Sequence, residues 1–155
     1  MNLLQYTFPG QVLLGAAVAL GLVANAHAAP APSRWATLEA IHQLENPTNR
    51  TTPGTFGELG AYQFRESTWR MHTTTPFALA NDRKTSDLVA VKHYEFLRQR
   101  LLQAGLPASV YNIALGWNGG IEAVVQGRSP AVAHDYAERA SNIAYEISAR
   151  VIAMR

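Results

Sequence analysis

The strongest constraint on the fold is the recurrence of apolar residues every three or four positions from Arg34 onward. This spacing places apolar side chains on one face of an α-helix, whereas a half-buried strand requires strict alternation. We find no convincing alternation and no internal repeat. The sequence therefore predicts a mainly α, compact helical domain with little or no β-structure. With 155 residues, of which 48% are hydrophobic and 15% charged, one domain with a sizeable core is expected.

Helix-starting and helix-breaking residues set the expected boundaries. A first helix is predicted from about Arg34 to Glu45, with an apolar face of Trp35, Leu38, Ile41 and Leu44. Asn46-Pro47 should end it, because the residue before proline avoids the helical region. Residues 48–60 are rich in Thr, Gly and Pro and are predicted to form a loop, with room for a short hairpin. A short helix is expected at 67–72, and a long one from an N-cap at Thr85 or Ser86 to Gly105, with a buried face of Leu88, Val91, Tyr94, Leu97 and Leu101. The next helix should run from Pro107 through Trp117 to a break at Asn118-Gly119-Gly120. A short helix should then reach Gly127, and a last one should run from Pro130 to Met154.

The N-terminal segment differs from the rest of the chain. Residues 12–26 are mostly apolar, and no charged side chain precedes Arg34. Ala26-His27-Ala28 then resembles a signal-peptidase site, so we expect a signal peptide at 1–28, an extended mature start at 29–33 and the domain at 34–155. The apolar run is shorter than the roughly 20 residues that span a bilayer, so no integral membrane span is expected. The first residues carry no Lys or Arg, although a signal peptide usually begins with a positively charged segment. We therefore expect a periplasmic or secreted protein, and the alternative is that the segment is an uncleaved hydrophobic anchor.

Composition excludes several classes of chemistry. Cysteine is absent, which removes disulfides and thiol catalysis. The net charge of +2 comes without a Lys/Arg cluster, so nucleic acid is not an expected partner, although slight basicity suits an anionic polymer. No two histidines are spaced as a helical metal-binding pair, so neither metal nor cofactor is expected. We interpret His42 and His93 as partly buried histidines.

Three segments contain the candidate functional residues. Residues 40–47 read AIHQLENP, residues 57–64 read GELGAYQF and are followed by Ser67-Thr68-Trp69, and residues 117–124 read WNGGIEAV. In this order they resemble the soluble lytic transglycosylase type of lysozyme-like domain. That family has a helix ending in a catalytic Glu with Asn-Pro soon after, a G-A-x-G-L-M-Q stretch with a following P-x-T, and a Y-N-A-G-P-G-A-V stretch. The resemblance extends from about Leu38 to Tyr145.

The resemblance implies a lysozyme-like domain with a cleft beside the Gly-rich loop. Such domains cleave the MurNAc-GlcNAc β-1,4 bond of peptidoglycan glycan strands and leave 1,6-anhydromuramyl ends. It implies Glu45 as the catalytic acid. By the same resemblance the expected substrate-binding residues are Asn46, Gly60, Tyr62, Gln63, Trp117, Asn118 and Tyr136. Small domains of this type often serve a secretion or conjugation apparatus, which is therefore a candidate protein partner.

The residues themselves agree with a role for Glu45. A general acid must keep its proton near neutral pH, which requires a raised pKa. Glu45 ends its helix, where the negative end of the helix dipole disfavours a carboxylate. The neighbouring side chains of Ile41, Leu44 and Pro47 are apolar and add desolvation in the same direction. On local grounds alone, a solvated Glu at a helix end is the better interpretation, and the downstream motifs reverse that preference.

The other candidates also have structural interpretations. The segment around Gln63 can be a tight turn with Tyr62 as core, although by the resemblance Tyr62 supplies an apolar wall for a sugar. Asn118 can be a helix C-cap. Trp117 can stack on a pyranose or pack in the core, and we expect core contact with one exposed edge.

Glu58 determines which reaction is expected. It stands where the family usually has Ala, and a second carboxylate is what a hydrolytic lysozyme needs. A lytic transglycosylase needs only one acid, because the muramyl C6 hydroxyl attacks intramolecularly. We expect Glu58 to be a solvated, poorly held loop residue, and therefore transglycosylation. The alternatives are a hydrolytic muramidase using Glu45 and Glu58, and a non-catalytic wall-binding protein of the same fold.

Overall fold

A computed structural model describes residues 31–154. These residues form six α-helices and one 3-10 helix, and no strand. The elements are α1 (Arg34–Glu45), α2 (Glu66–His72), η1 (Phe77–Asn81), α3 (Arg83–Gln103), α4 (Val110–Gly119), α5 (Ile121–Val125) and α6 (Ala131–Ala153). The predicted mainly α domain is therefore confirmed. The short hairpin considered for residues 48–60 does not form; the described residues contain one isolated antiparallel bridge, between Leu59 and Phe64. The signal peptide predicted at 1–28 lies outside the described residues, as do residues 29 and 30 of the mature start predicted at 29–33.

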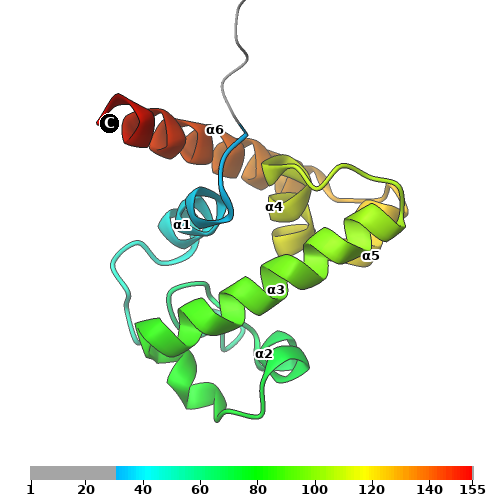
Figure 1. Cartoon of the computed structure of the whole chain (residues 1–155). Coiled ribbons are helices and arrows are strands. Elements are labelled where there is room, and N and C mark those ends of the chain that lie inside the picture. Colours follow the sequence, from blue (N-terminus) through cyan, green and yellow to red (C-terminus); the bar gives the residue numbers. More distant parts are fainter. Residues whose placement is uncertain (1–30, 155) are drawn as a thin grey trace, which may run out of the picture.

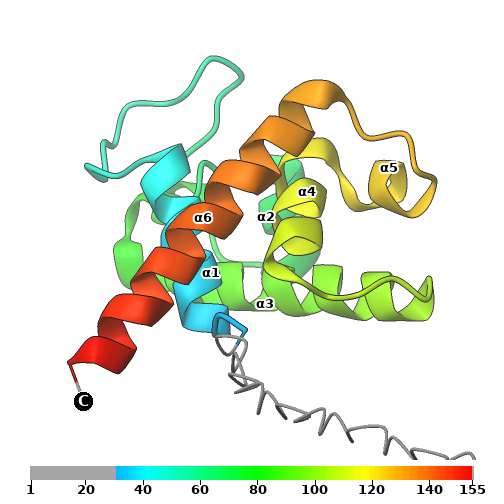
Figure 2. The ribbon, with the colours of Figure 1, turned by 90° about the horizontal axis from the view of Figure 1, so that it is seen from above.

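The long helices α3 and α6 lie on opposite sides of α1 and α4 (Figures 1 and 2). α6 packs against α1 and α4, while α2 and η1 pack against α3. One buried cluster is built from α3 to α6 and another from α1, the 59–64 segment, α2, η1 and α3. Trp117 and Tyr94 pack against both clusters and so connect the two halves of the core. No helix in the described part of the chain is both long and apolar enough to cross a bilayer.

Side-chain caps explain where the helices begin. Ser33 accepts the N–H of Ala36 at α1, and Asp82 accepts the N–H of Thr85 at α3. The start of α3 predicted from Thr85 or Ser86 was therefore wrong, because Asp82 is the cap. α4 likewise begins at Val110 after Ser109 and not at Pro107. Its break lies at Gly120 (φ 84°), so Asn118 and Gly119 are still helical.

The buried face of α3 differs from the predicted stripe. Leu88 is 68% exposed, and the side chains that α3 buries are Ser86, Val89, Ala90, His93, Leu97 and Leu101. The prediction assumed that the largest apolar residues of the helix would be buried. In the structure, η1 and the 59–64 segment instead pack closely against small residues of α3. Trp35, expected on the buried face of α1, is also exposed.

The loop from 46 to 65 connects the end of α1 to α2 (Figure 2). At Gly60 it returns close to η1. Gly60 allows this close return. Its φ is +78°, and a Cβ there would lie 1.7 Å from the carbonyl oxygen of Ala80. Only glycine combines this backbone conformation with the absence of a side chain. The loop is thereby fixed against η1 at the point where it turns toward Gln63.

Candidate active site

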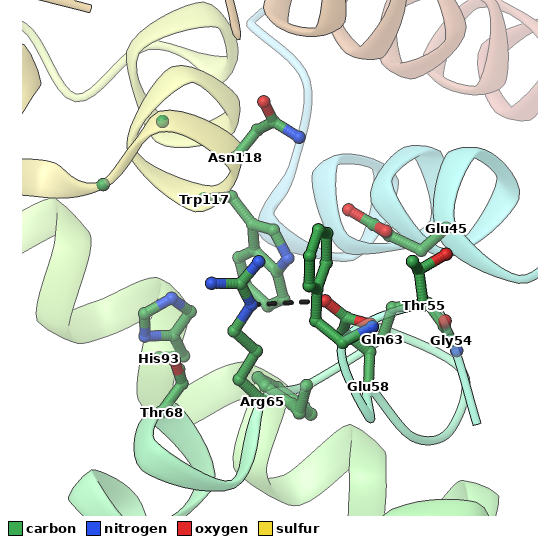
Figure 3. Close-up of a pocket in the computed structure, with 14 residues that line it drawn as sticks. Glu45, Gly54, Thr55, Glu58, Gln63, Arg65, Thr68, His93, Trp117 and Asn118 are labelled. Atoms are coloured by element: carbon green, nitrogen blue, oxygen red, sulfur yellow. Dashed lines mark hydrogen bonds and ion pairs between the residues drawn. The ribbon is translucent and has the colours of Figure 1, made fainter.

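A cavity of about 630 Å³ opens between the loop, α3 and the C-terminal end of α4 (Figure 3). Of the residues singled out from the sequence, it is lined by Glu45, Glu58, Gln63, Trp117 and Asn118. These residues come from three segments that are far apart in the chain. The cavity is also lined by side chains that were not expected at the site from the sequence: Thr55, Phe56, Phe64, Arg65, Thr68 and His93.

Glu45 lies at the C-terminal end of α1 and faces the cavity (Figure 3). Burial raises the pKa of this carboxyl, a hydrogen bond from Tyr136 lowers it, and the charge of Glu58 raises it further. The net pKa lies above the ordinary value for Glu, in the direction predicted from its position. Glu45 is therefore suited to hold a proton and deliver it to a bound molecule.

Tyr136 forms a hydrogen bond with Glu45. Its hydroxyl donates a 2.8 Å hydrogen bond to Oε1 of Glu45, and its side chain is 5% exposed. Burial and the neighbouring Glu45 raise the pKa of Tyr136 well above its usual value, so it stays a donor. Tyr136 was expected to bind substrate, but it does not line the cavity and instead positions the carboxyl group.

Asn46 was also expected to contact substrate, and its amide is fully used within the chain. Nδ2 donates to the carbonyls of Arg50 (2.9 Å) and Gly60 (3.1 Å), and Oδ1 accepts the N–H of Arg50 (2.9 Å). The side chain is 1% exposed. Asn46 and Gly60 therefore hold the loop in place, and neither lines the main cavity.

Gln63 and Tyr62 point in different directions. Gln63 lines the cavity and adopts a φ of 45°, an uncommon conformation for a residue with a side chain. Its Nε2 donates to the carbonyl of Gly60, and none of the described residues donates to its Oε1. Tyr62 is 3% exposed, donates to Asp87 at 2.7 Å and lies beside the guanidinium of Arg83. Tyr62 was expected to form an apolar wall for a sugar ring, but its side chain packs in the core.

Glu58 is not the solvated loop residue that the sequence suggested. Its Oε1 accepts from Nε of Arg65 at 3.2 Å (Figure 3), and its Oε2 accepts the N–H of Phe56 at 2.9 Å. The side chain is 15% exposed. Burial alone would raise the pKa of Glu58, but the hydrogen bonds from Phe56 and Arg65 outweigh it and lower the pKa. The cavity thus holds two carboxyl groups whose surroundings shift their pKa values in opposite directions, an arrangement typical of acid–base sites.

An aromatic wall closes the cavity on the side of α3. The ring of Trp117 lies 4.7 Å from that of His93, and both line the cavity. His93 is 8% exposed, and its Nδ1 lies 2.9 Å from Nε2 of His72. Burial, assisted by His72, lowers the pKa of His93 to about 3, so this wall is uncharged at neutral pH. Trp117 keeps the expected mixture of core contact and a cavity-facing edge.

Taken together, the geometry offers a carboxyl with a raised pKa, a fixed carboxylate, two amide side chains and an aromatic wall around one cavity. A group bound there would meet the carboxyl group of Glu45, while Gln63 and Asn118 face the same space. No three of the described His, Asp and Glu residues form a metal-binding group. Comparison of the chain with protein-family models, with curated proteins and with solved structures finds no match.

Proposed function

We propose that this chain is a peptidoglycan lytic transglycosylase that cleaves the MurNAc-GlcNAc β-1,4 bond and forms 1,6-anhydromuramyl ends. The observation that carries the proposal is Glu45: its pKa is raised by burial, it is held by Tyr136, and it faces a cavity of about 630 Å³. That volume lies within the usual range for ligand sites. The order of the three sequence motifs adds independent support.

In the proposed mechanism Glu45 serves first as acid and then as base. Oε1 accepts from Tyr136, while no described residue donates to Oε2, which leaves that oxygen for the substrate. Glu45 protonates the leaving glycosidic oxygen, and the substrate's N-acetyl carbonyl stabilises the cationic centre. The carboxylate then takes the proton of the muramyl C6 hydroxyl as that oxygen bonds to the anomeric carbon, which restores the acid.

Hydrolysis by a muramidase mechanism is the second candidate, and one observation favours it. Glu58 is ionised, held in place and close enough to Glu45 to raise its pKa. However, both of its oxygens already accept hydrogen bonds, and its pKa is lowered. A carboxylate in this state is a poor base for activating water, so we favour transglycosylation.

The product ends distinguish these reactions. Purified peptidoglycan should be digested with the protein and with its Glu45→Gln variant, and the fragments should be analysed by mass spectrometry. The proposal expects 1,6-anhydromuramyl ends that the variant does not produce. Reducing muramyl ends would establish the hydrolase instead, and binding without any cleavage would favour a non-catalytic wall-binding protein.

The proposed substrate lies outside the cytoplasm, so we also propose that the chain is exported to the periplasm or secreted. N-terminal sequencing of the protein from its native host should then find a mature chain that begins at Ala29. A protein that still begins at Met1 in the cytoplasm would contradict export. A secretion or conjugation apparatus is the protein partner that such a local wall-opening domain would serve.

A further inference from the structure

Phe56 is the exposed aromatic side chain of the cavity. Its side chain lies at the tip of the loop and is 75% exposed, whereas Phe64 is buried and Trp117 presents only part of its ring. A single exposed apolar residue is common and by itself has no functional meaning. Phe56 differs from such residues because it borders the cavity of Glu45 and because its surroundings hold it in place.

Backbone hydrogen bonds fix the turn that carries Phe56. The N–H of Gly54 donates to the carbonyl of Glu58 at 2.8 Å, and the N–H of Gly57 donates to the carbonyl of Gly54 at 3.1 Å. The N–H of Phe56 itself donates to Oε2 of Glu58 at 2.9 Å. The packing inside the turn is tight, since a Cβ on Gly54 would lie 2.7 Å from Oε2 of Glu58.

Arg65 holds the ring as well as the turn. Its guanidinium carbon lies 5.1 Å from the centroid of the Phe56 ring, within the range of a cation–π contact. The Nε of Arg65 binds Oε1 of Glu58. Glu58 therefore joins the backbone that carries the ring to the cation that lies over one face of the ring, so that the three residues form one unit at the cavity mouth.

We propose that Phe56 is a stacking platform for a pyranose ring of the glycan strand, and that Glu58 positions this platform together with Arg65. The proposal rests on the proposed function and assigns a substrate contact to it. The C–H face of a hexopyranose is apolar and packs on the electron-rich face of an aromatic ring, which here is the face of Phe56 that Arg65 does not cover. Because the turn is already ordered, little conformational freedom is lost when the sugar binds.

The occupant is argued from the chemistry beside the ring. The side chain of Arg65 is 61% exposed, and only its Nε is paired with a described carboxylate. Its terminal amino groups can therefore donate to hydroxyl or carboxylate oxygens of the strand that extend past the edge of the Phe56 ring. An acidic amino-sugar glycan offers both an apolar ring face and such oxygens.

Binding without turnover tests the platform. In the Glu45→Gln background, affinity for insoluble peptidoglycan is measured by co-sedimentation. Addition of Phe56→Ala should weaken binding about five- to tenfold, as expected for loss of one aromatic contact. Phe56→Tyr should retain affinity. Leu88→Ala, which removes an exposed apolar side chain on α3 that does not line the cavity, is the matched control.

A double-mutant cycle tests the positioning role of Glu58 in the same background. Glu58→Gln should weaken binding several-fold when Phe56 is present and have little effect once Phe56→Ala has been introduced. If the two losses simply multiply, Glu58 does not act through the ring. If the Glu45→Gln protein binds but Phe56→Ala does not weaken it, the platform is refuted while the proposed function stands. If the protein neither binds nor cleaves peptidoglycan, the proposed function fails and the platform fails with it.

Discussion

The hydroxyl of Tyr136 on α6 donates a 2.8 Å hydrogen bond to Oε1 of Glu45 at the end of α1. The two residues are 91 positions apart, so the bond depends on the packing of α1 against α6. It fixes one oxygen of a carboxyl whose pKa burial raises. The properties of Glu45 therefore depend directly on the packing of α6, since movement of α6 would change both the orientation and the pKa of this carboxyl group.

Replacement of Glu45 by Gln should abolish turnover and preserve the fold. Gln has nearly the same shape and can still accept from Tyr136, but it has no proton to transfer to the leaving group. We expect the rate of peptidoglycan cleavage to fall on the order of 10²–10⁴-fold or more. Release of soluble fragments measures this rate. Near wild-type release would show that Glu45 is not the acid.

The same variant should be more stable than the wild type above neutral pH. The folded-state pKa of Glu45 is raised above its unfolded value, so ionisation of this buried carboxyl costs stability as the pH rises past the unfolded pKa. Gln carries no such cost. We expect a higher free energy of unfolding for Glu45→Gln than for the wild type at pH 8, and no difference at pH 3. Urea denaturation at the two pH values measures the difference.

The neighbours of Glu45 should shift its pKa in opposite directions. Tyr136→Phe removes a hydrogen bond that stabilises the carboxylate, so the pKa of Glu45 should rise. Glu58→Gln removes a nearby negative charge, so the pKa should fall. The upper limb of the pH–rate profile should follow, to higher pH in the first variant and to lower pH in the second. NMR titration of the Glu45 carboxyl carbon provides a reading independent of activity, and shifts of the same sign would contradict this account.

Gln63 should contribute to substrate binding more than to chemistry. It faces the cavity, no described residue donates to its Oε1, and one neutral hydrogen bond is worth roughly 0.5–1.5 kcal/mol. Gln63→Ala should therefore raise KM by about tenfold or less and change kcat little. Steady-state kinetics separate the two parameters. A loss confined to kcat would show that Gln63 acts on the reaction itself.

The sequence predicted best the structural features that depend on residues adjacent in the chain. Asn46-Pro47 ended the first helix at Glu45 as expected, because a break before proline depends on adjacent residues alone. Glu45, Gln63 and Asn118 were expected to share one cleft from their motifs, and they line one cavity. This agreement supports the order of the motifs as a guide to spatial proximity.

The features that the sequence did not predict depend on tertiary contacts. Glu58 was expected to be solvated, but its partner Arg65 is brought beside it only after the loop has turned back. Tyr62 was expected on the cavity wall, yet its hydroxyl finds Asp87 on α3 and draws the ring into the core. Such outcomes depend on which element packs against the loop, which helical periodicity does not specify.

The loop should tolerate no side chain at Gly60. Gly60→Ala would place a Cβ on the carbonyl of Ala80 and force a positive φ on Ala, so we expect a loss of at least about 2 kcal/mol in the free energy of unfolding. Gly105→Ala is the control. Gly105 has a similar φ of +72°, but no atom lies within 4 Å of the position that a Cβ would take there, so only the backbone cost of about 1 kcal/mol should appear. Equal losses in thermal or urea unfolding would mean that the contact with η1 is not the constraint.

Glu58→Gln decides between the two reactions. In a transglycosylase the C6 hydroxyl of the substrate replaces water, so no second carboxylate has to act on a nucleophile. Glu58 then holds Phe56 and Arg65 and helps to raise the pKa of Glu45. Its loss should raise KM several-fold, shift the upper limb of the pH–rate profile to lower pH and leave 1,6-anhydromuramyl ends as the product. In a hydrolase the carboxyl group of Glu58 would have to act across roughly 5–9.5 Å from that of Glu45.

The hydrolytic mechanism therefore expects the rate to fall nearly as far as in Glu45→Gln, and it expects reducing ends from the wild type. Arg65→Gln is the matched control, because it removes the ion pair but leaves the carboxylate and the N–H of Phe56 in place. If Glu58 positions the platform, both variants should raise KM, and Arg65→Gln should do so at least as much, because it also removes the proposed contact of Arg65 with the glycan. If Glu58 is a base or nucleophile, Arg65→Gln should retain far more activity than Glu58→Gln, since the carboxylate remains and is freed from its strongest hydrogen-bond partner.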